Sequence, residues 1–258
     1  MQVLEVNLVQ HWKTPSSKPY LTSDKVHIWY ANLDLSVQET EELNRILSPD
    51  EKEKANRFRF EEHRRRFIVA RGSLRQLLAN YLNITPENIQ FEYSDRGKPS
   101  LSNHYNPDNL NFNVSHSHNL ALYAFTHQNR VGIDLEYLLR RSSDTVQIAR
   151  RFFAPPEYEF ISSLEENRQQ ELFLHIWTIK EAYLKATGEG LSGSLDGTQV
   201  FFVDNQPQGL AAVADNSQQA IDWLVHSFTP APNFIATVAV ENKCNSIQQE
   251  KIRFWTIK

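Results

Sequence analysis

Apolar residues recur along the chain with two periods, one typical of helices and one typical of strands. The stretch 63–82 is predicted to be an amphipathic helix, with one stripe formed by Phe67, Ala70, Leu74, Leu77, Leu78 and Tyr81. A second long helix is predicted at about 171–187, with a stripe formed by Leu172, Ile176, Ile179, Tyr183 and Ala186. Shorter helices are predicted at 36–47 and 48–58, with Ser36 and Ser48 as N-caps, and on either side of Pro155–Pro156.

Strands are predicted where β-branched and aromatic residues gather, at 25–33, 110–116, 120–126, 131–138, 199–203, 220–228, 234–240 and 251–257. The strands 120–126 and 131–138 are joined by only four residues, HQNR, so we expect a hairpin. Helices and short strands occur in both halves of the chain. The predicted fold class is therefore α+β, in two similar-sized lobes at 1–126 and 127–258.

Composition narrows the function classes. The 258 residues suffice for a sizeable core, and 40% hydrophobic with 22% charged residues is ordinary for a globular protein. The formal charge of −4 argues against a generally cationic nucleic-acid binder. The single cysteine, Cys244, excludes an intramolecular disulfide and a thiolate zinc cluster. Because no apolar run is long enough to span a membrane and no secretory signal layout is present, we expect a cytoplasmic protein.

The stretch VGIDLE (131–136) carries two carboxylates on one face of a strand. Strand alternation places Val131, Ile133 and Leu135 on one side and Gly132, Asp134 and Glu136 on the other. Two carboxylates at this spacing can share one divalent ion, and a glycine beside them lets a backbone or a ligand come close. The alternative is a half-exposed strand with its polar face in water.

The helix at 171–187 places Trp177, Glu181 and Lys185 in one column beside its apolar stripe. A routine Glu–Lys pair explains two of these residues but not the tryptophan. The alternative is that Glu181 lies at a metal and Lys185 on a phosphate oxygen. The glycines at 188, 190 and 193 spell G-x-G-x-x-G, but they follow a helix, so they are interpreted as its C-cap and a loop rather than a dinucleotide site.

Two further stretches are candidates for phosphate binding. Asn113, Ser115 and His116 are expected where a strand gives way to a turn, with open backbone N–H groups that suit an anion. The arginine-rich stretch 57–71 has the side chains that bind phosphate bidentately, although a solvated cluster paired with Glu61 and Glu62 explains it equally.

Six segments together resemble 4'-phosphopantetheinyl transferases of the Sfp (surfactin) type and occur in the order found in that family. They are SPDEKEKANRF, HRRRFIVARGSLR, GKPSL, FNVSHS, VGIDLE and WTIKEAYLKATGEGL. The resemblance implies two pseudo-symmetric α+β lobes with coenzyme A in the cleft between them. It implies a monomer that modifies an apo acyl or peptidyl carrier protein and has no nucleic-acid or membrane partner.

The resemblance also implies site residues. The Mg²⁺ ligands would be Asp134, Glu136 and Glu181, and the coenzyme A contacts would be Lys54, Arg64, Lys98, Asn113, Ser115, His116 and Lys185. A lysine that some members have three residues before the position of Lys54 is Glu51 here, so one phosphate contact differs.

The implied reaction transfers 4'-phosphopantetheine from coenzyme A to a carrier serine and releases 3',5'-ADP. The serine proton would pass to Glu181 or to a metal-held water near Glu136, and Lys185 would neutralise charge on the leaving phosphate. Two alternatives stay open at this point. One is another Mg²⁺-dependent enzyme that cleaves a nucleotide pyrophosphate, and the other is a non-enzymatic nucleic-acid module formed by residues 57–75.

Overall fold

The computed structural model describes residues 9–102, 106, 108–140, 144–190, 195–214, 216–243 and 245–257. Its elements, in chain order, are β1 (Val26–Asn32), α1 (Val37–Arg45), α2 (Pro49–Asn56), α3 (Glu61–Leu82), β2 (Phe91–Tyr93), β3 (Pro99–Leu101), β4 (Leu110–Ser117), β5 (Leu120–His127), β6 (Val131–Tyr137), α4 (Thr145–Phe152), α5 (Pro155–Ser162), α6 (Glu166–Thr187), β7 (Thr198–Val203), β8 (Gln206–Val213), α7 (Ser217–Ile221), β9 (Trp223–Phe228), β10 (Phe234–Glu241) and β11 (Ile252–Thr256).

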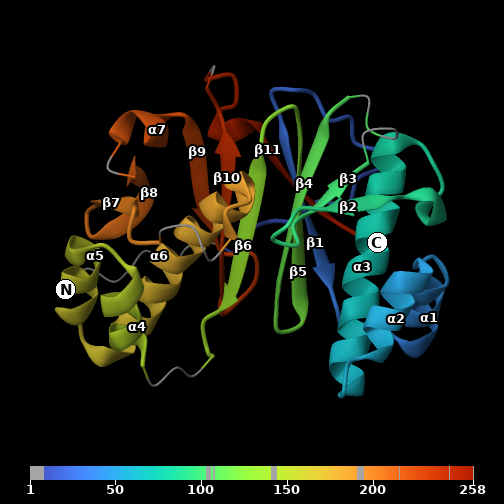
Figure 1. Ribbon diagram of the computed structural model, residues 1–258, viewed down its shortest axis with the longest axis horizontal. Helices are drawn as coiled ribbons and strands as arrows, with labels where there is room; N and C mark the ends of the chain where they lie inside the picture. The colour runs from blue at the N-terminus through green and yellow to red at the C-terminus, as the bar shows by residue number, and fades with distance from the viewer. Residues whose placement is uncertain are drawn as a thin grey trace.

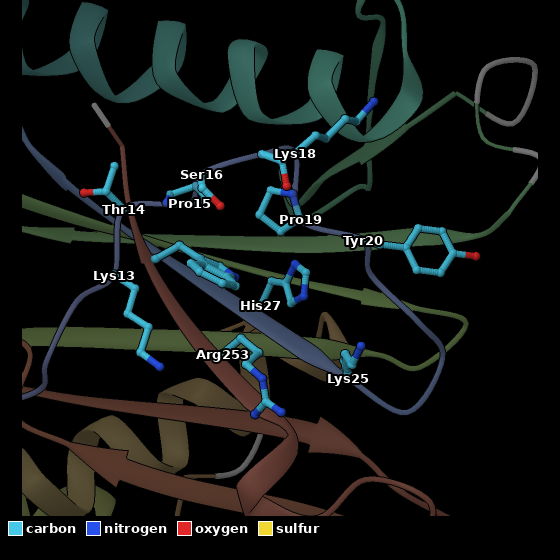
Figure 2. A pocket seen from close by; sticks show the side chains of 12 residues that line it. Lys13, Thr14, Pro15, Ser16, Lys18, Pro19, Tyr20, Lys25, His27 and Arg253 are labelled. Carbon is cyan, nitrogen blue, oxygen red and sulfur yellow. The ribbon is translucent and has the colours of Figure 1, made fainter.

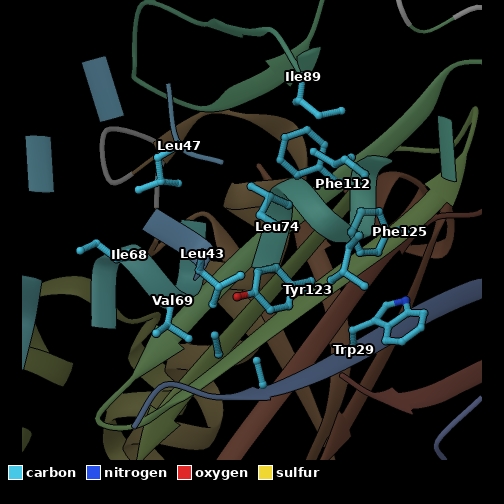
Figure 3. Close-up of a cluster of buried hydrophobic side chains, with 14 of the residues drawn as sticks. Trp29, Leu43, Leu47, Ile68, Val69, Leu74, Ile89, Phe112, Tyr123 and Phe125 are labelled. Carbon is cyan, nitrogen blue, oxygen red and sulfur yellow. The ribbon is translucent and has the colours of Figure 1, made fainter. Parts of the chain in front are cut away.

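The first half packs the long helix α3 against a four-stranded sheet of order β11-β1-β5-β4 (Figure 1). The apolar stripe of α3 faces this sheet, and Leu74 is buried in one cluster with Trp29, Tyr123 and Phe125 (Figure 3). The hydroxyl of Tyr123 donates to the carbonyl of Ala70, 2.9 Å away, which fixes the helix on the strand. Burial of this stripe against a sheet provides the stability that a solvated helix lacks.

The second half repeats the scheme with α6 on the sheet of order β6-β10-β9. A Cβ added at Gly132 of β6 would lie 2.0 Å from the Ala182 carbonyl oxygen of α6, so only glycine allows this approach. The expectation that Gly132 lets a neighbour come close is therefore confirmed, and the neighbour is the helix backbone. The polar face of β6 is covered by α6 and is not a half-exposed face in water.

The two sheets pack against each other through apolar side chains that point away from the long helices. Val26, Ile28 and Leu122 of the first sheet lie in one buried cluster with Ile133 and Val238 of the second. Figure 1 shows the outcome, with α3 and α6 on opposite sides and the strands between them. Across the part of the chain that is described, no helix has the length and apolarity needed to cross a membrane.

The α+β class is confirmed, and so are the predicted helices, including the capping box in which Ser36 and Glu39 bond each other's backbone. Both 22-residue helices begin before the predicted start, α3 at Glu61 and α6 at Glu166. The predicted hairpin is wrong, because β5 pairs with β4 and β1 whereas β6 pairs with β10. β8 and α7 were not predicted.

The division into lobes at residues 126 and 127 stays a prediction, as does a ligand cleft between them. The last strand, β11, pairs in parallel with β1 and so lies in the sheet of the first half.

Candidate active site

The seam between β4 and β6 brings the predicted residues of the two halves together. Asn113 is buried on β4, and its Oδ1 accepts a hydrogen bond from the backbone N–H of Ile133 at 2.9 Å. Further along the seam, the backbone N–H of Tyr137 donates to Ser117 Oγ at 3.2 Å. These side-chain bonds join two strands that belong to different sheets. They place Ser115 beside Asp134.

Asp134 is the centre of a charged hydrogen-bond network. Its Oδ1 accepts from Lys185 Nζ of α6 at 2.6 Å and from Ser115 Oγ at 3.1 Å. Ser115 Oγ in turn accepts from Lys185 Nζ at 2.9 Å, and the Ile133 carbonyl lies 3.3 Å from the same nitrogen. The site therefore draws one residue each from β4, β6 and α6, far apart in sequence.

Two carboxylate oxygens in this region are buried without a hydrogen-bond partner in the described structure, Asp134 Oδ2 and Glu181 Oε1. A buried acceptor without a donor is costly. Burial, followed by the charge of Asp134, raises the pKa of Glu181 to about 7. The same two causes, in the same order, raise the pKa of Glu136 to about 7. The three carboxylates therefore share one electrostatic environment and repel one another.

A cation would relieve both problems, since it would satisfy the free oxygens and offset the repulsion. Nevertheless, among the residues that the structure describes, no three His, Cys, Asp or Glu side chains form a group ready to hold a metal ion. The Lys185 ammonium already neutralises one oxygen of Asp134. The donor set fits a hard divalent cation, and the three-carboxylate site stays a prediction.

Of the three residues in the column on α6, Trp177 packs among apolar side chains of the second half. Trp177 stacks on Phe173, with ring centroids 5.7 Å apart, and packs against the apolar cluster of the second half. Sequence reasoning overlooked its neighbour Lys180, which is fully buried and bonds Glu157 at 2.7 Å. This ion pair joins α6 to α5. The sequence signal for it was a lysine next to the apolar stripe of the helix, which indicates a buried charge with a partner. Trp177 and Lys180 hold the helix that presents Glu181 and Lys185.

Lys98 lies at the other end of α6, where its Nζ donates to the carbonyl of Ala186 at 2.9 Å. Burial lowers the pKa of Lys98 to about 8. Arg96 donates to the carbonyl of Glu189, and Gly188 ends the helix in the left-handed conformation, as predicted for a C-cap. The third glycine of the series, Gly193, lies outside the described residues. The loop before β3 thus brings two cations to the end of the helix that carries Lys185.

Ser115 and His116 lie inside a strand and not at its end, which corrects the expected turn. β4 continues to Ser117, and these two residues pair with Leu122 and Ala121 of β5. Because β4 is the edge strand of its sheet, the backbone N–H and C=O groups of only one of these two residues point toward β5. His116 retains an exposed side-chain surface; desolvation of its ring by neighbouring protein groups, followed by the charge of Lys185, lowers its pKa.

Lys54 and Arg64 lie on α2 and α3 and make other contacts. Lys54 Nζ is 5.5 Å from the centre of the Phe67 ring, and Arg64 pairs with Glu61 at 3.2 Å. Among the described residues, neither side chain contacts Asp134, so the structure does not bring these two residues into the Asp134 network.

The arginine-rich stretch is largely paired within the protein, with Arg57 on Glu53 and Arg66 on Asp34 and Glu62. Glu51 has its own role, because it receives Arg71 and the fully buried Arg75 at 2.6 Å each. Glu51, which replaces a lysine that contacts phosphate in some family members, therefore forms buried ion pairs within the protein.

Two family models match parts of the chain. Residues 34–128 match a family model described as 4'-phosphopantetheinyl transferase, N-terminal, and residues 130–239 match the 4'-phosphopantetheinyl transferase superfamily. A solved holo-(acyl-carrier-protein) synthase from Bacillus anthracis is also similar, at 25% identity and a TM-score of 0.35 over 43% of this chain and 95% of that one. That score is too low to support an argument.

Two relatives are more informative. The 4'-phosphopantetheinyl transferase HetI of Nostoc sp. is 42% identical over 90% of this chain and 95% of its own length. The 4'-phosphopantetheinyl transferase Sfp of Bacillus subtilis is 31% identical over 68% of this chain and 75% of its own. The chain therefore belongs to the 4'-phosphopantetheinyl transferase superfamily, and it is a transferase enzyme that acts on carrier proteins.

Proposed function

We propose that this enzyme moves the 4'-phosphopantetheine group of coenzyme A to a serine of an apo acyl or peptidyl carrier protein, with Mg²⁺, and releases 3',5'-ADP. The observation that supports this most is the Asp134–Ser115–Lys185 network beside the free oxygens of Asp134 and Glu181. A pyrophosphate is stabilised by a cation and by a metal ion. The Lys185 ammonium would supply the cation, and the carboxylates of Asp134 and Glu181 would hold the metal ion.

In the reaction, the carrier serine oxygen attacks the β-phosphorus of coenzyme A. A new P–O bond to serine forms, the P–O bond to the ADP portion breaks, and the serine proton must leave. Glu181, next to Asp134 and Lys185, would accept that proton. The alternative acceptor is a metal-held water near Glu136.

Lys185 would stabilise the charge that develops on the departing phosphate. Its side chain is 28% exposed, so it can reach a ligand while keeping its bond to Asp134. Ser115 Oγ accepts from the same nitrogen at 2.9 Å and donates to Asp134. A cation held by two partners needs little reorganisation at the moment of reaction.

Asp134, Glu136 and Glu181 are the residues that would hold Mg²⁺. When bound, the ion would neutralise the pyrophosphate and stabilise the leaving ADP.

The remaining predicted contacts fall into two groups. Lys98 and His116 lie near Lys185 and would contact the phosphates of coenzyme A directly. The side-chain oxygen of Asn113 already accepts a hydrogen bond from the backbone N–H of Ile133, so Asn113 would act by positioning β4. Lys54 and Arg64 belong to α2 and α3, and their side chains would have to turn from their present partners to reach the nucleotide.

The test is incubation of the purified protein with coenzyme A, MgCl₂ and an apo acyl carrier protein, followed by intact-mass spectrometry and nucleotide chromatography. We expect the carrier to gain one phosphopantetheine and an equal amount of 3',5'-ADP to appear. Hydrolysis of coenzyme A without carrier labelling would favour the alternative nucleotide-cleaving enzyme. A panel of apo carriers from fatty-acid, polyketide and peptide pathways then identifies the preferred partner.

A further inference from the structure

A cavity lies at the β11 edge of the four-stranded sheet, away from the seam that carries Asp134. It has a volume of about 480 Å³ and is formed by the chain segment 13–20 together with the first residues of β1 and the residues of β11. Figure 2 shows its lining from close by. In the sheet order β11-β1-β5-β4, this cavity is at one edge and Ser115 at the other. The cavity is thus separate from the proposed site of transfer.

The charge of this cavity is positive on several sides. Lys13, Lys25 and Arg253 line it, and Figure 2 shows that they come from different elements, Lys13 and Lys25 from the chain before β1 and Arg253 from β11. Lys18 adds a fourth cation at the rim, and the lining residues include no Asp or Glu. Thr14, Ser16 and Ser17 add hydroxyl groups. Arg253 also donates to the backbone carbonyls of Glu250 and Ile252. A cavity lined by several cations and by no carboxylate favours an anion.

His27 forms a buried part of the lining, with only 1% of its surface exposed. Its Nδ1 lies 2.7 Å from the hydroxyl of Tyr81, which also accepts a hydrogen bond from Trp29 Nε1 at 2.8 Å. Burial, aided by the charges of Lys25 and Arg253, lowers the pKa of His27 to about 3, so the ring is neutral. The hydrogen bond between His27 Nδ1 and the Tyr81 hydroxyl forms with either tautomer of the neutral ring, because the hydroxyl can donate to Nδ1 or accept from it.

The neutral ring of His27 adds no charge to the cavity, so the lysine and arginine side chains of the lining determine its charge. Cations from several elements match the oxygens of a tetrahedral anion. A carboxylate has two oxygens in one plane and a single charge. A phosphate group carries about −1.5 to −2 charges and three acceptor oxygens, which uses donors from several sides.

We propose that this cavity binds a small organic phosphate, with the phosphate group held by Lys13, Lys25 and Arg253. The volume lies in the range of small-molecule sites, about 300–1,000 Å³, and far exceeds what one phosphate group fills. The rings of Trp255 and Tyr20 line the remaining space and would contact the organic part. The proposal is independent of the reaction at Asp134.

The probe is the indole N–H signal of Trp255 in a ¹H–¹⁵N correlation spectrum, assigned among the five tryptophans with a Trp255→Phe variant. The protein is titrated with inorganic phosphate, with ribose 5-phosphate and with acetate at constant ionic strength. We expect saturable shifts of Trp255 with both phosphates, tighter binding of the sugar phosphate, and at least fivefold weaker binding of acetate.

Lys13→Ala and Arg253→Ala should each weaken phosphate binding by about tenfold, the loss of one charge-assisted hydrogen bond. Lys52→Ala removes one positive charge from exposed α2 and serves as the matched control, and it should bind like the wild type. Lys185→Ala, at the proposed transfer site, should also leave these shifts unchanged. The proposal is overturned if no saturable shift occurs, if both cavity variants bind normally, if acetate binds as tightly as the phosphates, or if Lys185→Ala abolishes the shifts.

Discussion

Gly132→Ala tests the contact that positions α6 on β6. The added Cβ would lie 2.0 Å from the Ala182 carbonyl oxygen and 2.5 Å from the Ala186 amide nitrogen. Both atoms belong to the helix backbone, so no side-chain rotation can relieve the clash. Ordinary contact begins at 3.4 Å, so the strand and the helix must separate by roughly 1.4 Å.

This separation acts on stability and on the site together. Overpacking of a well-packed core costs typically 1–3 kcal/mol, and a clash with backbone belongs at the upper end, so we expect a loss of about 3 kcal/mol. The Lys185–Asp134 contact of 2.6 Å bridges the same two elements and would be stretched. We therefore expect carrier labelling to fall by more than tenfold at a temperature where the variant is folded.

Equilibrium urea unfolding and the carrier-labelling assay measure the two effects. Gly97→Ala is the control, because its Cβ would meet nothing within 4 Å although its φ of +79° makes alanine cost about 1 kcal/mol. The reasoning is refuted if Gly132→Ala unfolds within about 0.5 kcal/mol of the wild type, or if it is no less stable than Gly97→Ala.

Three further predictions use buried or charged groups. Lys180→Met should lower the free energy of unfolding by about 3–5 kcal/mol, because it leaves Glu157 buried without its partner, and adding Glu157→Gln should restore part of the loss in urea unfolding. Because the pKa of His27 falls from 6.5 to about 3 on folding, the unfolded chain binds more protons below pH 6.5, and stability is lost as the pH falls. Between pH 7 and pH 5 the wild type should therefore lose about 2 kcal/mol more than His27→Gln, and equal losses would contradict the assignment. Asp134→Asn should reduce carrier labelling at least a hundredfold with an unchanged circular-dichroism spectrum, and near-normal turnover would exclude Asp134 from the site.

Local patterns along the chain were enough for much of this protein. A helix is stabilised by caps and by a stripe with a period of 3.6, and both are properties of neighbouring residues, so α1, α2, α3 and α6 were predictable. The alternation that buries Val131, Ile133 and Leu135 is local in the same sense. The family motifs also fall within short stretches, which is why the class of enzyme was recognisable before any geometry.

Only the tertiary structure decided which strands and charges meet. A strand's hydrogen-bond partner is not encoded by its own period, so β5 joined β1 and β4 instead of β6, and β11 returned to β1 across the whole chain. Ser115 became part of a charged network because β4 continues beside β6, and Glu51 became a buried partner of Arg75 because α2 packs on α3. Interactions between residues distant in sequence depend on packing of both partners, and no single segment carries that information.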